Sequence, residues 1–121
     1  MAKILLVDDS TLSRRMLRTI LEVSGHQIIE ARDGISAIES YFLENPDLVL
    51  LDLVMTGMRG EEVLEKLLSM DKKARVIVAT ADLQTLTHNA VKQAGALGLI
   101  NKPFIAANVL ETVNAVLARG Q

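Results

Sequence analysis

The chain contains no cysteine and no tryptophan, and only one tyrosine, two phenylalanines and two prolines occur among its 121 residues. Without cysteine, disulfide bonds, thiolate catalysis and cysteine-ligated zinc are excluded, and the composition is compatible with a reducing cytosol. So few aromatic side chains argue against a surface that stacks on single-stranded nucleic acid. The sequence is 50% hydrophobic, which instead predicts a core made of aliphatic side chains.

Strong net charge and long apolar runs are also missing. The formal net charge is −2 at pH 7, so the chain lacks the basic footprint of a nucleic-acid-binding domain. No apolar segment has the length needed to cross a bilayer, and the run after Met1-Ala2-Lys3 is too short for the core of a signal peptide. We therefore expect a cytoplasmic protein with no membrane insertion and no nucleic-acid partner. The length predicts one domain, residues 1–121.

Five short aliphatic runs alternate with segments of helical periodicity. The runs are unbroken rather than alternating, which is typical of strands in a sheet that is covered on both faces. Five βα units are too few for an eight-stranded barrel, and their crossovers should be right-handed. The sequence therefore predicts a three-layer α/β fold with a doubly wound parallel sheet. The expected strands are 4–7, 28–31, 48–51, 76–79 and 97–100.

The segments between the strands carry start and stop signals for helices. Ser10 or Thr11 should begin the first helix, which we expect to end at Ser24 before Gly25. Asp33-Gly34 should open the second helix, and Gly60 the third. The predicted apolar faces, in chain order, are Leu12, Met16 and Ile20; Ile35, Ile38 and Phe42; Val63, Leu64, Leu67 and Leu68; Leu83, Leu86, Ala90, Val91 and Ala94 after a cap at Asp82; and Ile105, Val109, Leu110, Val113, Val116 and Leu117.

Carboxylates, a hydroxyl and an ammonium group stand where the expected strands stop. Asp8 and Asp9 follow the first run, Asp52 the third, Thr80 the fourth and Lys102 the fifth. In an open parallel sheet, ligands bind in the crevice beyond the carboxyl ends of the strands. We therefore expect these five side chains to converge at one rim.

Three carboxylates at one rim repel one another at neutral pH unless a cation lies among them or a pKa rises. Mg²⁺ prefers octahedral oxygen ligands and keeps several waters, so carboxylates, a backbone carbonyl and a phosphoryl oxygen would suit it. A carboxylate nucleophile at such a site can form an aspartyl phosphate, with the metal and Lys102 neutralising charge on the transferring group. The Thr80 hydroxyl could then donate to a phosphoryl oxygen.

Taken together and in order, these motifs resemble a response-regulator receiver domain of the stand-alone, chemotaxis (CheY-like) type, over essentially the full length. Val7-Asp8-Asp9-Ser10 matches the acidic pair that holds Mg²⁺, and Leu51-Asp52-Leu53-Val54-Met55 matches the phosphoacceptor loop. Thr80-Ala81 matches the switch hydroxyl, and Lys102-Pro103-Phe104 matches the lysine with its proline. The resemblance, rather than the spacing, implies the flavodoxin-like strand order 2-1-3-4-5.

The resemblance implies phosphorylation of Asp52, with Mg²⁺ held by Asp8, Asp9, Asp52 and the backbone carbonyl of Val54. A sensor histidine kinase or a small phosphodonor would supply the phosphoryl group, and Thr80 and Lys102 would then contact it. The surface of the fourth helix, fifth strand and fifth helix would signal to a protein: a motor, a phosphatase or a histidine phosphotransfer domain. The chain would catalyse its own phosphorylation and dephosphorylation but no metabolic reaction.

Some positions depart from the family pattern. Thr56 stands where the family usually has proline, four residues after the acceptor. Leu99, the expected output-coupling residue, replaces the tyrosine or phenylalanine that often swings inward on activation. Val54 and Asp82 occupy positions that influence how water reaches the acyl phosphate.

Alternative interpretations remain open. The chain could be an interaction-only pseudo-receiver, or a phosphohydrolase of the haloacid-dehalogenase type. The latter class wants a second aspartate two residues after its nucleophile, where this chain has Val54. Asp8 and Asp9 could also serve only to cap the first helix.

Other polar residues are expected to lie at the surface. His26 and His88 have no acidic or histidine neighbour at ligand spacing, so we interpret them as surface residues rather than metal ligands. Arg14, Arg15 and Arg18 should form a solvated basic face of the first helix rather than a docking patch.

Overall fold

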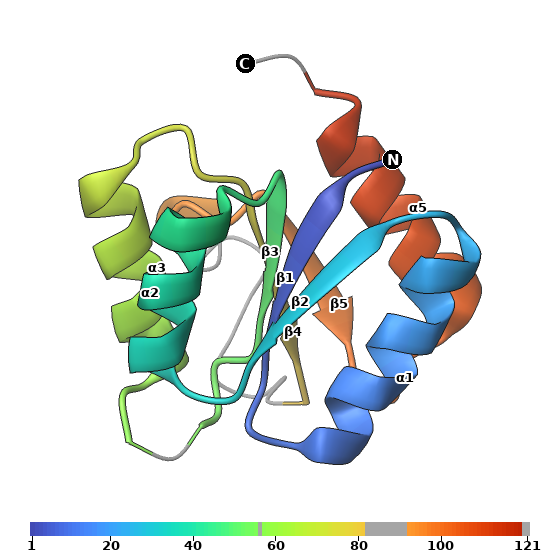
Figure 1. Cartoon of the computed structure of the whole chain (residues 1–121), viewed down its shortest axis with the longest axis horizontal. Helices are drawn as coiled ribbons and strands as arrows, with labels where there is room; N and C mark the ends of the chain where they lie inside the picture. The colour runs from blue at the N-terminus through green and yellow to red at the C-terminus, as the bar shows by residue number, and fades with distance from the viewer. Residues whose placement is uncertain (56, 82–91, 120–121) are drawn as a thin grey trace.

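The structure, a computed structural model, describes residues 1–55, 57–81 and 92–119 (Figure 1). One five-stranded sheet runs in the order β2-β1-β3-β4-β5, and every neighbouring pair of strands is parallel. The predicted fold class and the strand order implied by the family resemblance are confirmed. The strands are β1 (Lys3–Val7), β2 (Gln27–Ala31), β3 (Leu48–Leu51), β4 (Val76–Thr80) and β5 (Gly98–Asn101), and the described helices are α1 (Thr11–Val23), α2 (Gly34–Glu44), α3 (Gly60–Met70) and α5 (Ala106–Leu117).

The sheet lies between two helical layers, with α2 and α3 on one side and α1 and α5 on the other (Figure 1). Successive side chains of a strand point to opposite faces, so each strand serves both layers. In β1, Leu5 and Val7 pack towards α2 and α3, whereas Ile4 and Leu6 pack towards α1 and α5. This double coverage explains why the strands are apolar without alternation. No helix in the described part of the chain is long and apolar enough to cross a membrane.

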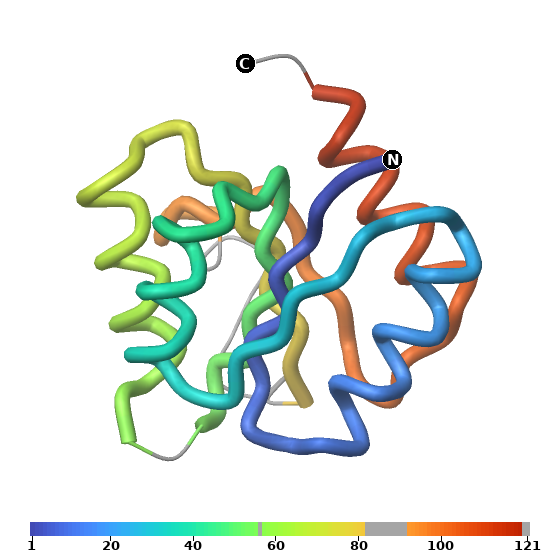
Figure 2. Tube along the Cα trace, viewed as in Figure 1, coloured from blue at the N-terminus to red at the C-terminus, as the bar shows by residue number. Residues whose placement is uncertain are grey.

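All strand ends that carry the candidate residues lie at the same edge of the sheet. Figure 2 shows the N-terminus and the end of α5 at the upper edge, while β1 runs down to its turn into α1. Because the sheet is wholly parallel, β3, β4 and β5 also end at the lower edge. Topology alone therefore places the residues that follow these strands at one rim.

The start of α1 is as predicted, but its buried face is not. Ser10 is the N-cap, and its Oγ accepts a hydrogen bond of 3.2 Å from the backbone N–H of Ser13. Leu12 and Met16 are 64% and 39% exposed, and Ile20 is partly buried against the core, whereas Leu17 and Leu21 are fully buried. The pairs Leu12 with Met16 and Leu17 with Leu21 lie about 140° apart around an α-helix, and packing on the sheet selects the second pair.

The predicted face of α2 is also wrong. Ile35 and Phe42 are 66% and 42% exposed, while Ile38 is partly buried against the core. Gly34, Ala37 and Tyr41 form the buried face instead. The helix lies close to its neighbours at its start, since a Cβ at Gly34 would be 2.8 Å from the Met58 sulfur. Small residues therefore face inward there.

The other helices follow the prediction more closely. Val63, Leu64 and Leu67 of α3 are buried, and so are Val109, Val113 and Val116 of α5. Ile105, however, is 58% exposed. Of the fourth predicted helix, Asp82, Leu83, Leu86, Ala90 and Val91 lie outside the described residues, as does His88, and Ala94 is exposed.

Candidate functional site

Three carboxylates converge at the carboxyl edge of the sheet, as the sequence predicted. One oxygen each from Asp8, Asp9 and Asp52 lies within 4.8 Å of the others. Asp8 and Asp52 are buried, with 2% and 4% of their surface exposed, while Asp9 is exposed. They open into a cleft of about 510 Å³ that is lined by Asp8, Asp9, Ser10, Asp52, Val54, Ala81 and Lys102. Two enclosed acids and one exposed acid thus share a solvent-accessible space.

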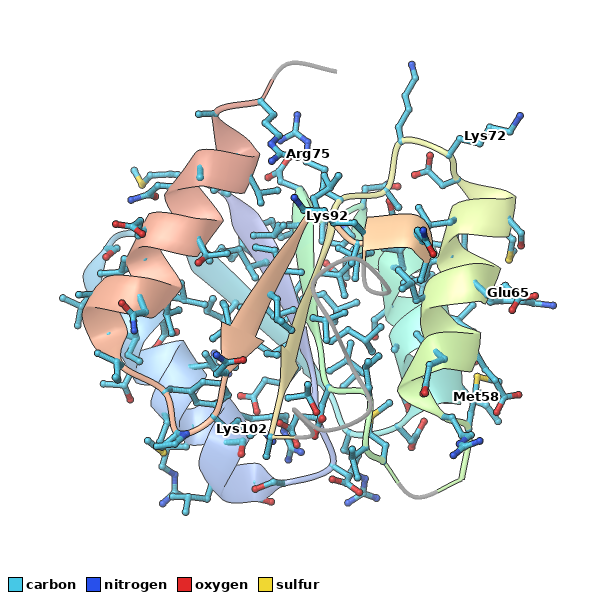
Figure 3. All side chains as sticks on the ribbon, turned by 180° about the vertical axis from the view of Figure 1, so that it is seen from behind. Met58, Glu65, Lys72, Arg75, Lys92 and Lys102 are labelled. Atoms are coloured by element: carbon cyan, nitrogen blue, oxygen red, sulfur yellow. The ribbon has the colours of Figure 1, made fainter. Side chains whose placement is uncertain are left out.

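Lys102 bridges the two buried acids. Its Nζ donates to Asp8 Oδ2 at 2.9 Å and to Asp52 Oδ2 at 3.1 Å. Figure 3 shows Lys102 at the edge where β4 and β5 end. Burial lowers the pKa of Lys102, but the hydrogen bond and charge of Asp8 and the charge of Asp52 outweigh it and raise that pKa. Lys102 therefore stays protonated and supplies one positive charge to the cluster.

The contact with Lys102 does not fully offset the effects that disfavour the ionised form of Asp8. Burial raises the pKa of Asp8, and the charge of Asp52 adds to this, against the lowering effect of Lys102 and the Ser10 N–H. An additional cation near Asp8 would favour its ionised form. All three acids offer oxygen donors, the type of ligand that Mg²⁺ prefers. The donor set therefore fits a hard divalent cation.

The backbone around Asp8 is fixed by residues outside the acidic cluster. The Asp8 N–H donates to the Ala31 carbonyl at 3.1 Å, and Asp8 Oδ1 accepts the Ser10 N–H at 2.9 Å. Arg14 Nη1 donates to the Asp8 carbonyl at 2.6 Å. Only 12% of the Arg14 side chain is exposed, so the prediction of a solvated basic face is wrong for this residue. Sequence reasoning missed this contact because only the turn into α1 brings Arg14 back to the strand end.

Asp52 is held by its own loop and by the start of α3. Its N–H donates to the Val7 carbonyl at 2.9 Å, and its Oδ1 accepts the Val54 N–H at 3.0 Å. A Cβ at Gly60 would lie 2.4 Å from the Asp52 carbonyl oxygen, so only glycine fits there without a shift. The sequence predicted Gly60 as a helix start but did not reveal this close approach. Val54 lines the cleft with 58% of its surface exposed.

Thr80 and Leu99 are not among the residues that line the cleft. Thr80 is fully buried at the end of β4, and its carbonyl accepts the Lys102 N–H at 3.2 Å. Leu99 is half-buried, pairs with Val78 across β4 and β5, and packs against the core on the α2 and α3 side. Two other residues of the expected site, Thr56 and Asp82, lie outside the described residues.

His26 is remote from the acids. It is half-buried rather than fully at the surface, and its Nδ1 accepts a hydrogen bond of 3.1 Å from the Ala2 N–H. Burial lowers its pKa, and the positive N-terminus lowers it further. One ring nitrogen is thus already engaged in a structural contact.

Comparison with known proteins agrees with the fold. The chain is 39% identical over 117 residues to Chemotaxis protein CheY of Bacillus subtilis (strain 168), with 95% of this chain and 97% of that protein covered. It is 36% identical over 115 residues to Sporulation initiation phosphotransferase F of the same organism, with 95% and 93% covered.

Structural similarity is equally extensive. The crystal structure of response regulator protein TrrA from Thermotoga maritima in complex with Mg(2+)-BeF matches with a TM-score of 0.88 at 32% identity, over 96% of this chain and 99% of that one. Residues 4–114 match the family described as the response regulator receiver domain. The chain therefore belongs to the response regulator receiver domain family.

Proposed function

We propose that residues 1–121 act as one receiver domain that accepts a phosphoryl group on Asp52 in a Mg²⁺-dependent reaction. The observation that carries this proposal is the buried Asp52 carboxylate, which shares a cleft with Asp8, Asp9 and Lys102. Both of its oxygens have partners: Oδ1 accepts the Val54 N–H and Oδ2 accepts from Lys102. The nucleophile is thus oriented by the fold before any phosphodonor arrives.

In the proposed reaction, a carboxylate oxygen of Asp52 attacks the phosphorus of a phosphohistidine or of an acyl phosphate. The new bond joins phosphorus to the Asp52 oxygen, and the bond from phosphorus to the donor's nitrogen or oxygen breaks. The leaving group takes the electron pair of that bond. Lys102 lies close enough to Asp52 to neutralise charge on the transferred group.

Asp8, Asp9, Asp52 and the backbone carbonyl of Val54 are the proposed holders of Mg²⁺. When bound, the ion supplies positive charge to the phosphoryl oxygens and offsets the repulsion among the acids. The mutual proximity of the three carboxylates supports this assignment. The Mg(2+)-BeF complex of the related TrrA protein is a further argument by analogy.

Thr80 and Lys102 are proposed to contact the phosphoryl group after transfer and to change the surface formed by β5 and α5. Thr80 is buried next to Ala81, which lines the cleft, and its carbonyl accepts a hydrogen bond from the Lys102 N–H, which supports a connection between Thr80 and Lys102. Leu99 lies in β5, the strand that leads directly to Lys102, and packs into the core. We propose Leu99 as the residue that transmits the change, by repacking rather than by an aromatic swing.

A sensor histidine kinase is the proposed donor, and the output is proposed to be a protein contact: a motor, a phosphatase or a histidine phosphotransfer domain. The two curated relatives described above carry a chemotaxis name and a phosphotransferase name at similar identity. Both kinds of output therefore fit. We propose no metabolic substrate, since the only catalysis assigned to the domain is its own phosphorylation and dephosphorylation.

The proposal is tested by incubating the protein with acetyl phosphate and measuring its intact mass. We expect the parent to gain one phosphoryl group in Mg²⁺ and none in EDTA. Asp52→Asn should gain none while staying folded by circular dichroism. Asp47→Asn, which alters an exposed aspartate at the opposite edge of the sheet, is the matched control and should label like the parent.

Three outcomes would overturn the proposal. A folded parent with no mass gain under any donor would indicate an interaction-only pseudo-receiver. Sustained, Asp52-dependent release of phosphate from a generic phosphate ester would indicate a phosphohydrolase. Labelling of Asp52→Asn at the parental level would show that the acceptor is another residue.

A further inference from the structure

Arg14 stands in a place that helix stability does not explain. It is the fourth residue of α1, a helix with no acidic residue in its first turn. The amino end of a helix carries partial positive charge, which disfavours a nearby cation. Yet the side chain is 12% exposed, whereas that of Arg18, one turn later, is 41% exposed. Some other interaction must favour an enclosed guanidinium here.

The guanidinium of Arg14 joins β2 to the end of β1. Its Nε donates to Glu30 Oε1 at 2.9 Å, and its Nη1 donates to the Asp8 carbonyl at 2.6 Å. Both bonds involve a charged group, and such bonds are shorter and stronger than neutral ones. Arg18 donates to the other oxygen of Glu30 and so holds that carboxylate in place.

Residues 30 and 31 of β2 therefore fix both peptide groups of Asp8. The Ala31 carbonyl accepts the Asp8 N–H directly, at 3.1 Å. Glu30 fixes the Asp8 carbonyl indirectly, through Arg14. Arg14 thus restrains the orientation of the peptide that joins Asp8 to Asp9. Asp9, which follows this peptide, is one of the three clustered acids.

We propose that Arg14 and Glu30 form a clamp that positions the Asp8-Asp9 peptide for Mg²⁺ binding. The inference rests on the proposed function, because it assigns the clamp to the metal site of that reaction. Both residues are positioning residues, since each acts through the backbone of Asp8. Arginine is required because one rigid, planar fork reaches Glu30 and the Asp8 carbonyl together, which a lysine ammonium on a flexible stem does not reproduce.

The test measures Mg²⁺ affinity by isothermal titration calorimetry, independently of phosphorylation. Arg14→Met keeps an unbranched apolar stem and removes every donor, whereas Arg14→Lys keeps the charge. We expect both to bind Mg²⁺ about tenfold more weakly than the parent, in line with losses seen for residues that orient metal ligands. Glu30→Gln should show a smaller loss. Arg15→Met removes the same charge from the exposed neighbouring position and should bind like the parent.

A second measurement separates positioning from damage to the fold. In ¹H–¹⁵N spectra without metal, the amide signals of Asp8 and Asp9 should shift in Arg14→Met while those of β4 and β5 stay in place. With acetyl phosphate, this variant should need more Mg²⁺ for half-maximal labelling and reach the parental rate at saturation. If Arg14→Met does not fold, Arg14→Lys and Glu30→Gln decide the question.

Parental Mg²⁺ affinity in folded Arg14→Met, or full recovery in Arg14→Lys, would overturn the clamp. So would a parent that takes up no Mg²⁺. If the parent binds Mg²⁺ with the expected dependence on Arg14 but Asp52 is never labelled, the proposed function fails and the clamp stands.

Discussion

The β1–α1 loop, which carries Asp8 and Asp9, is fixed by hydrogen bonds, whereas the β3–α3 loop after Asp52 is fixed by close packing. Around Asp8, the partners are the Ala31 carbonyl, the Ser10 N–H, the Arg14 guanidinium and Lys102. They come from β2, α1 and the end of β5, so distant parts of the sequence meet at one residue.

The β3–α3 loop depends instead on the absence of a side chain. A Cβ at Gly60 would lie 2.3 Å from the Leu53 Cα and 2.4 Å from the Asp52 carbonyl oxygen. The Gly60 N–H also donates to the Leu53 carbonyl at 3.3 Å. The first turn of α3 therefore rests directly on the backbone of the proposed acceptor.

This difference predicts that the two loops respond differently to pH and to salt. The proposed metal ligands are oriented by charged partners, whose strength depends on pH and on screening by salt. The backbone beside the proposed acceptor is held by close packing against Gly60, which neither condition changes. Lys102 contacts an acid from each loop and is the link between the two kinds of support.

The largest effect on stability is expected from Lys102→Met, which removes that link. Two buried acids would lose their shared cation, so the free energy of unfolding in EDTA should fall by about 3 kcal/mol, the low end for a broken buried ion pair. Mg²⁺ should restore part of this loss. Urea unfolding with and without Mg²⁺ measures both, with Lys66→Met on the exposed face of α3 as control.

Labelling of Asp52 by acetyl phosphate should persist in Lys102→Met, because the carboxylate nucleophile remains. The shifts that phosphorylation causes in amide signals of β5 and α5 should shrink. Equal stability of variant and parent in EDTA would mean that the two loops are not coupled through Lys102.

Gly60→Ala should disturb the β3–α3 loop and leave the β1–α1 loop unchanged. The inserted methyl group meets backbone atoms, which cannot rotate away, so we expect a loss of roughly 1–3 kcal/mol and slower labelling of Asp52. Gly57→Ala is the matched control: its φ of 82° makes alanine strained, but no atom lies within 4 Å of the new Cβ. That control should lose about 1 kcal/mol and label normally. Similar labelling rates in both variants would contradict the steric role of Gly60.

The smallest effect is expected from Glu30→Gln, and it should depend on pH. Burial raises the pKa of Glu30, but Arg18 and Arg14 outweigh it and hold that pKa below its ordinary value of 4.5. Because the folded pKa is the lower one, the stabilisation is present above the ordinary value and is lost as pH falls through the folded pKa. At neutral pH the variant should be less stable by at most about 1 kcal/mol.

Urea unfolding of the parent and of Glu30→Gln across acidic pH measures this prediction. The difference between them should shrink steadily as the parent's Glu30 becomes protonated. A difference that stays constant down to the acid limit would show that the Glu30 charge contributes nothing, and that any loss in the variant has another cause.

The strands and the rim were predictable because they depend on local pattern and on one rule of topology. Unbroken aliphatic runs indicate strands covered on both faces, and parallel strands bring their carboxyl ends to one edge. Asp8, Asp9, Asp52 and Lys102 follow from that rule and are found together. Thr80 follows too, although its complete burial does not.

The helix faces show where local pattern fails. In α1, both Leu12 with Met16 and Leu17 with Leu21 form an apolar pair with helical spacing, and only the second pair is buried. In α2 the smaller residues Gly34 and Ala37 face the core. Periodicity shows that a helix has an apolar face. The distance and rotation of the helix relative to the sheet decide which face is buried.

The sequence by itself determined the succession of strands and helices along the chain, the aliphatic core and the edge at which the acids meet. Each of these depends on residues that are close in the chain or on the shared direction of parallel strands. Only the tertiary structure decided how that edge is held: Arg14 reaches back to Asp8 while anchored by Glu30, and Gly60 touches the backbone of Asp52. Such contacts join separate elements at distances of a few ångströms. They depend on how whole helices settle on the sheet, and no local pattern encodes that placement.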